Sequence, residues 1–338
     1  MLRLTIHRVF RFLLLTLFTC GMLIACNTQQ PTAESSASSS STQPLVVASS
    51  PWPGFAGHYV AVAKDFFKDE GITVKDEYFQ VATDVNTAIL AGKLDLAWAG
   101  VPDLVPMASR DPSVRLIMLS DYSNGADGIL ARNVSKPEDL KGKEIAWEAL
   151  PLQVLLLQKY LESGGLTQQD VKLLNITAAE AATAFASNKV DVAVTYEPWL
   201  SKATQEGKGQ VIFSSKNTNI IPDGLIAKTN VIDSRKADIE AYLRAVDKGV
   251  QFVRDNPKEA AEIVGERLGV KPEEVPALID TVRIFSVAEN KSIVFNSSDS
   301  MNVMDSLAFA AKTSEAVKLI NSPVDSTKLY DDSLVKGL

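Results

Sequence analysis

Short apolar segments alternate with helical patterns along most of this 338-residue chain. The apolar runs of the first part cover residues 45–48, 94–98 and 114–119, and the helical patterns between them end at Gly71 and Gly92. Such alternation is typical of strands joined by helices. The sequence therefore predicts an α/β fold with a largely parallel sheet.

A second alternating unit follows a loop signal at residues 122–127, and the chain is mainly helical from residue 238 onward. A length of 338 residues suggests about two domains at roughly 150 residues each. We therefore expect more than one compact part, each with its own strands.

The first 25 residues have the layout of a secretory signal peptide. Arg3, Arg8 and Arg11 precede an apolar run at 12–25 that is short for a membrane-spanning helix. The run ends Leu-Ile-Ala-Cys, which resembles the lipobox of bacterial lipoproteins and predicts Cys26 as the lipidation site. The alternative is an uncleaved membrane anchor with a chance cysteine. In either case the rest of the chain is expected outside the cytoplasm, on the periplasmic or cell-surface side.

Residues 26–44 are predicted to form a tether. After Cys26 they contain six serines and two prolines but no large apolar residue. Such a segment cannot bury enough surface to order itself, and 18 residues have a root-mean-square reach of roughly 25 Å.

Charge and residue counts exclude several function classes. The net charge is −7, and without the three arginines of residues 1–25 it becomes −10, so nucleic-acid binding has little support. Two cysteines near the start and two histidines, His7 and His58, exclude the usual His/Cys zinc site and a Cys–His nucleophile pair. We expect no enzyme activity, no metal and no cofactor.

Several segments together resemble a known family. They are GHYVAVAKDFFKDEGITV, AGKLDLAWAG, KPEDLKGKEIA, NKVDVAVTYEPWL and VRDNPKEAAEIV. In this order, and behind a lipoprotein start, they resemble the sulfonate-, taurine-, nitrate- and thiamine-pyrimidine-binding proteins of bacterial ABC importers. The resemblance extends from about residue 45 to about residue 320.

This resemblance implies a two-lobed periplasmic-binding-protein fold of the type II-like kind, with a ligand cleft between the lobes. Two crossover hinge strands are expected near 121–132 and 220–228. Lobe 1 is then 45–125 plus 225–338, and lobe 2 is 126–224. The implied partners are a small-molecule ligand and an ABC permease with its ATPase, and the chain is expected to be a monomer.

Ligands of open α/β sheets bind at the carboxyl ends of the strands. This rule selects the loops 49–55, 80–84, 98–103, 147–153 and 195–199, together with the crossover 222–224. His58 begins a helix, where it either packs and caps or lines the cleft. The predicted ligand-binding residues are Ser49, Ser50, Trp52, Thr83, Asp84, Trp98, Gly100, Glu148, Thr195, Glu197 and Asp223.

The five loops contain acids and tryptophans but no Lys or Arg. An amine or an aromatic nitrogen compound would use both features, since carboxylates pair with cations and aromatic faces attract them. A taurine-like sulfonate, which the family favours, would depend on helix N-termini instead. Nitrate or bicarbonate would leave the tryptophans without a role. The acids could also cap helices and the tryptophans could pack in the core.

Three functions remain open from the sequence. The first is a binding protein that delivers a solute to an ABC importer. The second is a lipoprotein that senses a ligand, and the third is an enzyme similar to thiamine-pyrimidine synthases.

Overall fold

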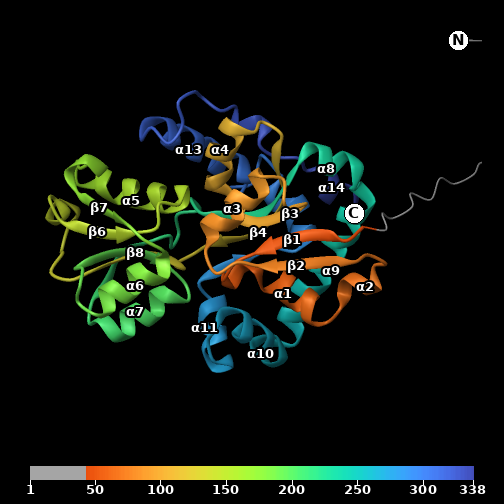
Figure 1. Ribbon diagram of the computed structural model, residues 1–338, viewed down its shortest axis with the longest axis horizontal. Helices are drawn as coiled ribbons and strands as arrows, with labels where there is room; N and C mark the ends of the chain where they lie inside the picture. Colours follow the sequence, from red (N-terminus) through yellow and green to blue (C-terminus); the bar gives the residue numbers. More distant parts are fainter. Residues whose placement is uncertain (1–42) are drawn as a thin grey trace, which may run out of the picture. The chain divides into compact units, whose positions relative to one another are not determined.

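The computed structural model describes residues 43–338, which form two β-sheets flanked by helices (Figure 1). The predicted signal peptide, the predicted lipidation site Cys26 and the tether up to residue 42 lie outside the described residues.

The first sheet has six strands in the order β11-β4-β10-β3-β1-β2. Strand β1 runs parallel to β2 and β3, whereas β10 runs antiparallel to β3 and β4, and β11 antiparallel to β4. The strands are β1 (Leu45–Ser49), β2 (Val74–Tyr78), β3 (Leu96–Gly100), β4 (Val114–Ser123), β10 (Pro222–Lys228) and β11 (Val282–Ile284).

The second sheet has five strands in the order β7-β6-β8-β5-β9. Strand β6 is parallel to β7 and β8, whereas β5 is antiparallel to β8 and β9. The strands are β5 (Asp127–Ala131), β6 (Glu144–Trp147), β7 (Lys172–Asn175), β8 (Val192–Tyr196) and β9 (Gln210–Ser214).

The expectation of a largely parallel sheet is wrong. Four of the nine strand pairs are parallel and five are antiparallel. The chain leaves the first sheet after β4 and re-enters it through β10, which runs against both of its neighbours. Hydrophobic periodicity reports the faces of a strand but not the direction of the strand beside it.

Helices cover both sheets. In Figure 1, α5 lies on one side of the five-stranded sheet and α6 and α7 lie on the other. Within residues 43–338 no helix combines the length and apolarity needed to cross a bilayer. The α-helices are α1 (Ala56–Ala63), α2 (Phe66–Asp69), α3 (Ala82–Leu90), α4 (Val101–Arg110), α5 (Pro151–Ser163), α6 (Ala178–Ala186), α7 (Trp199–Gly207), α8 (Thr229–Ser234), α9 (Lys236–Asp255), α10 (Pro257–Leu268), α11 (Val275–Ile279), α12 (Val287–Glu289), α13 (Val303–Ala316) and α14 (Ser333–Gly337).

One helical pattern differs from the structure. The pattern that ends at Gly71 is divided into α1 and α2, because Asp65 adopts a left-handed conformation with φ 56°. Asn256 stands at the N-cap position of α10, but its side chain makes no capping hydrogen bond.

Two short segments, 124–126 and 215–221, join the two sheets. They are tied together by Ser215, whose Oγ lies 2.6 Å from Ser123 Oγ and accepts from the amide of Gly125 at 2.9 Å. Gly125 has φ 119°, a conformation open to glycine alone at little cost. We call the part built on the six-stranded sheet lobe 1 and the part built on the five-stranded sheet lobe 2. The residue limits predicted for the two lobes remain a proposal. The strands that belong to each sheet support it.

Candidate ligand-binding cleft

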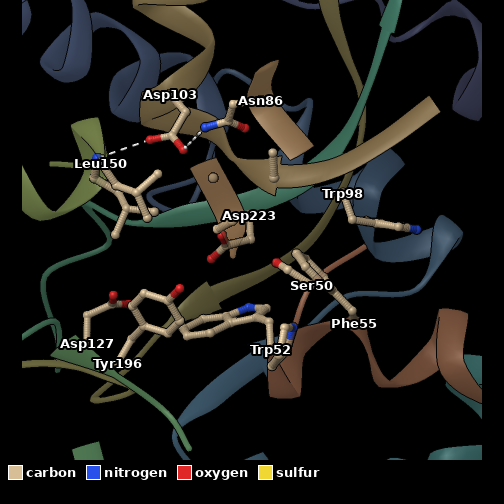
Figure 2. A pocket seen from close by; sticks show the side chains of 15 residues that line it. Ser50, Trp52, Phe55, Asn86, Trp98, Asp103, Asp127, Leu150, Tyr196 and Asp223 are labelled. Atoms are coloured by element: carbon tan, nitrogen blue, oxygen red, sulfur yellow. Dashed lines mark hydrogen bonds between the residues drawn. The ribbon is translucent and has the colours of Figure 1, made fainter. Parts of the chain in front are cut away.

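A cavity lies where the loops of the two lobes meet (Figure 2). The cavity has a volume of about 30 Å³. It is therefore narrow, with room for a few atoms. Lobe 1 contributes Ser50, Pro51, Trp52, Phe55, Ala82, Asn86, Trp98, Ala99, Gly100, Asp103 and Asp223, and lobe 2 contributes Asp127, Leu150, Leu152 and Tyr196.

Aromatic rings form much of the wall. Trp52 of lobe 1 meets Tyr196 of lobe 2 edge to face, with ring centroids 6.0 Å apart. Phe55 and Trp98 lie with their centroids at 5.5 Å. Figure 2 shows Trp52 and Tyr196 side by side along one border of the cavity. The faces of such rings carry negative charge density and attract cations.

Three buried carboxylates face this cavity: Asp103, Asp127 and Asp223, each at most 5% exposed. The residues that line it, all within the described chain, include no Lys, Arg or His. Burial raises the pKa of Asp103 and of Asp127 to about 7. Burial also raises the pKa of Asp223, and the nearby acids add to that rise. The cleft therefore concentrates carboxyl groups away from water, where burial disfavours their charged forms.

Two of these carboxylates are incompletely satisfied. Asp127 Oδ2 and Asp223 Oδ2 have no hydrogen-bond partner among residues 43–338, although both atoms are buried. Asp103, by contrast, accepts from Asn86 Nδ2 at 2.7 Å and from the amide of Leu152 at 3.2 Å. A buried acceptor without a donor is costly, so each of these two oxygens can accept a further hydrogen bond at a gain in stability.

A fourth acid, Asp121, supports the wall from behind. Its carboxylate accepts from Trp52 Nε1 at 3.1 and 3.2 Å and from Ser120 Oγ at 2.8 Å. Asp121 faces Asp223 across the β4–β10 pair. Burial raises the pKa of Asp121. These bonds fix the indole of Trp52 at the edge of the cavity.

Hydrogen bonds across the cleft hold the lobes together. Asp103 of α4 accepts from the amide of Leu152, at the N-terminus of α5 in lobe 2. Thr83 of α3 donates to Glu148 Oε1 of lobe 2 at 2.5 Å. Together with the Trp52–Tyr196 contact, these bonds describe a closed arrangement of the two lobes.

A buried hydrogen-bond chain fixes the second tryptophan of the wall. Trp98 Nε1 donates to the hydroxyl of Tyr242 at 2.8 Å, and that hydroxyl donates to His58 Nδ1 at 2.8 Å. His58 Nε2 lies 3.0 Å from Asp76, which also pairs with Arg267. Burial lowers the pKa of His58, which keeps the ring neutral and lets Nδ1 accept.

The structure brings five of the predicted binding residues to the cavity. These are Ser50, Trp52, Trp98, Gly100 and Asp223. The other six do not line it, and their role in ligand binding stays a prediction. They are Ser49, Thr83, Asp84, Glu148, Thr195 and Glu197.

Most of these six side chains have other contacts. Besides Thr83, Glu148 accepts from the amide of Ala178 at 3.2 Å. The hydroxyl of Thr195 donates to the Ala178 carbonyl at 3.0 Å. Glu197 accepts from the amide and hydroxyl of Ser201 at the start of α7. Ser49 is buried, whereas Asp84 is exposed in the first turn of α3.

Sequence reasoning missed Asn86 and Asp127, and it did not select Phe55, Asp103 and Tyr196 from their loops. Asn86 lies one turn beyond Ala82 on α3, so helical spacing from a loop residue could have found it. Asp127 is the first residue of the crossover strand β5, and the crossovers were already expected to border the cleft. His58, Trp147 and Trp199 do not line the cavity.

Residues 52–260, which include most of this wall, match the family described as NMT1/THI5 like. The chain belongs to this family. The matched range contains thirteen of the fifteen lining residues, all except Ser50 and Pro51.

Curated relatives of this NMT1/THI5-like chain bind different solutes. A Bacillus subtilis protein assigned to aliphatic sulfonate binding is 25% identical over 207 residues, which cover 60% of this chain and 62% of that protein. The formylaminopyrimidine-binding protein of Halalkalibacterium halodurans is 23% identical over 214 residues, covering 61% and 64%. The match therefore spans less than two thirds of either relative's length.

Solved structures establish the fold. The alkanesulfonate-binding protein SsuA from Xanthomonas axonopodis pv. citri superposes with a TM-score of 0.71 at 16% identity, covering 86% of this chain and 98% of that one. The desulfurization enzyme DSZB superposes with a TM-score of 0.60 at 15% identity, covering 87% and 98%. The chain thus has the two-lobed periplasmic-binding-protein fold, with the cleft between its lobes.

Proposed function

We propose that the protein is an extracytoplasmic solute-binding protein that delivers a small organic nitrogen compound to an ABC importer. The two-lobed fold, the closed cavity between the lobes and the family membership support this function. The observation that carries the choice of ligand is the set of three buried carboxylates, Asp103, Asp127 and Asp223, in a cavity without a basic side chain.

A sulfonate, nitrate or bicarbonate fits this cavity poorly. Each would place its negative charge among buried carboxylates that already repel one another. A protonated amine reverses the sign of every one of these interactions and adds attraction to the faces of Trp52 and Trp98. The formylaminopyrimidine-binding relative is named for a nitrogen-rich solute, which supports this choice.

The N-terminal features complete the proposal. Lipid attached to Cys26 would anchor the protein, and residues 27–44 would hold the folded part near the membrane surface. There a monomeric binding protein can present its closed lobes to a permease and its ATPase. A ligand sensor would use the same closed cleft. Solute uptake measured in cells that lack the protein distinguishes import from sensing, since loss of uptake supports import.

We infer that the protein is not an enzyme, although a desulfurization enzyme shares its fold. In the described chain, His58 is held between Tyr242 and Asp76 and does not line the cavity. The two cysteines of the sequence are Cys20 and Cys26, both in the N-terminal region. Within residues 43–338, neither a thiol nor an imidazole lines the cavity.

A thermal-unfolding panel on the full-length chain in mild detergent tests this function. The panel contains small amines, pyrimidines, taurine, alkyl sulfonates, nitrate and bicarbonate. A ligand at about 100 times its dissociation constant stabilises the folded state by about 2.7 kcal/mol. We expect stabilisation by nitrogen cations alone. Stabilisation by an anion would show that the ligand class is wrong, and no stabilisation by any solute would contradict a binding protein.

A further inference from the structure

The two free carboxylate oxygens of the cavity come from opposite lobes. Asp223 is on β10 of lobe 1 and Asp127 begins β5 of lobe 2. Figure 2 shows Asp223 near the centre of the cavity and Asp127 at its border, beside Tyr196. A donor placed between them would contact both lobes at once.

We propose that the ligand is a small organic cation with several N–H donors, which bridges Asp127 and Asp223 and replaces bound protons as the lobes close on it. This inference rests on the proposed function and specifies its substrate class. It follows from the unsatisfied oxygens Asp127 Oδ2 and Asp223 Oδ2, from the narrow cavity and from the surrounding charges.

The free oxygens set the donor requirement. In the ionised form of the two carboxyl groups, each is a buried acceptor that only an N–H or O–H donor can satisfy. A quaternary ammonium has the charge but no donor, so it would leave both oxygens unsatisfied. The narrow space limits the ligand to a few heavy atoms, as in methylammonium or guanidinium.

The surrounding groups set the proton requirement. The charged or titratable side chains that act on Asp127 and Asp223 are Asp103, Asp121 and Glu197, and Glu148 and Tyr196 stand next to this group. None of them carries a positive charge. Burial and the neighbouring carboxylates therefore raise the pKa of Asp127 and of Asp223 and favour their protonated forms. A cation makes the ionised form favourable, so binding releases protons.

The linkage has a definite sign. Because burial raises the pKa of Asp127 to about 7, a cation that pairs with its ionised form must displace the proton below that pH. We therefore expect the affinity to rise by about tenfold per pH unit for each proton released, from about pH 5 to about pH 7.

Isothermal titration calorimetry on the full-length chain in detergent tests the proposal. The probes are guanidinium and methylammonium, with tetramethylammonium as the matched cation that lacks N–H donors. We expect at least one of the first two to bind about a hundredfold more tightly than tetramethylammonium. Heats measured in two buffers of different ionisation enthalpy should show proton release near pH 6. Equal binding of tetramethylammonium, or an affinity independent of pH, would overturn the proposal.

Two variants assign the effect to the bridging residues. Asp127→Asn and Asp223→Asn should each weaken cation binding by about tenfold or more and flatten its pH dependence. Asp191→Asn is the matched control, an exposed carboxylate at the opposite end of β8 that should leave both unchanged. Without ligand near pH 8, the first two variants should melt no lower than the unaltered protein, because each removes a repelled charge. Unchanged affinity in both variants would refute the bridge.

The results separate this inference from the proposed function. Binding of taurine or another anion in place of cations would remove the inference while leaving a solute-binding protein. Failure of every solute in the panel, for a protein that unfolds cooperatively, would remove both.

Discussion

Replacement of Tyr242 by phenylalanine tests how the wall of the cleft is fixed. The Tyr242 hydroxyl connects two buried groups, the indole N–H of Trp98 and His58 Nδ1. All three residues are at most 1% exposed, so water cannot take over either bond. The ring itself stacks on Phe67, with centroids 5.0 Å apart and planes 4° apart, and phenylalanine keeps that contact. The substitution therefore removes the hydroxyl and little else.

The size of the effect follows from the two groups left behind. A buried donor or acceptor without a partner costs about 1–3 kcal/mol. Tyr242→Phe leaves one buried donor, the Trp98 indole N–H, and one buried acceptor, His58 Nδ1, without a partner. We therefore expect the free energy of unfolding to fall by about 2–5 kcal/mol. We also expect weaker ligand binding, because the indole of Trp98 is then free to turn.

Urea unfolding followed by tryptophan fluorescence measures this change. Tyr160→Phe is the matched control, because the Tyr160 ring stacks on Phe213 while no hydrogen bond of its hydroxyl is seen within residues 43–338. The control should change the free energy of unfolding by less than about 0.5 kcal/mol. Equal effects of the two substitutions would refute the role given to the Tyr242 hydroxyl.

Three further predictions concern packing, pH and closure. Gly249→Ala should destabilise the fold by about 3 kcal/mol or more, since the added Cβ would lie 2.0 Å from the Gly57 carbonyl oxygen where α9 crosses α1. Without ligand, the free energy of unfolding should fall from about pH 4 to about pH 7, because burial raises the pKa of Asp127 to about 7 and the unfolded chain therefore loses this proton at a lower pH than the folded one. Thr83→Val should speed ligand release several-fold, since it removes the bond to Glu148 across the cleft, worth about 1 kcal/mol.

Each of these has its own control. Gly337→Ala, in α14, meets no atom closer than 3.6 Å and should be tolerated, so equal melting temperatures for the two glycine variants would contradict the packing argument. Asp127→Asn should reduce the pH dependence of the free energy of unfolding. An unchanged dependence would show that Asp127 is not its source. Thr87→Val removes only a bond within α3, to the Thr83 carbonyl, and should leave release rates unchanged in stopped-flow traces.

The sequence was sufficient to locate the cleft. Strand ends can be recognised from apolar runs, and the rule that ligands lie at the carboxyl ends then selects loops regardless of their partners. Trp52, Trp98 and Asp223 were found in this way, and all three line the cavity. The loops contain acids but no Lys or Arg, and the same is true of the cavity, because no basic side chain reaches it from elsewhere in the described chain.

What the sequence could not provide were contacts between segments far apart. Glu148 lies in a selected loop, but its partner Thr83 is 65 residues away, and only the closed fold shows that they meet across the cleft. Strand direction was missed for the same reason, since β10 follows β9 in the chain but pairs with β3 and β4. Which loop residue faces the cavity depends on such pairings.

The identity of the bound solute is the most direct test of a cleft built for a cation. The protein would be purified under mild conditions from the cells that make it, then denatured, and the released small molecules analysed by mass spectrometry in both ion modes. The account predicts a small nitrogen base that is positively charged at neutral pH and contains no sulfonate group. Recovery of taurine, another sulfonate or an inorganic anion, in amounts close to that of the protein, would contradict it.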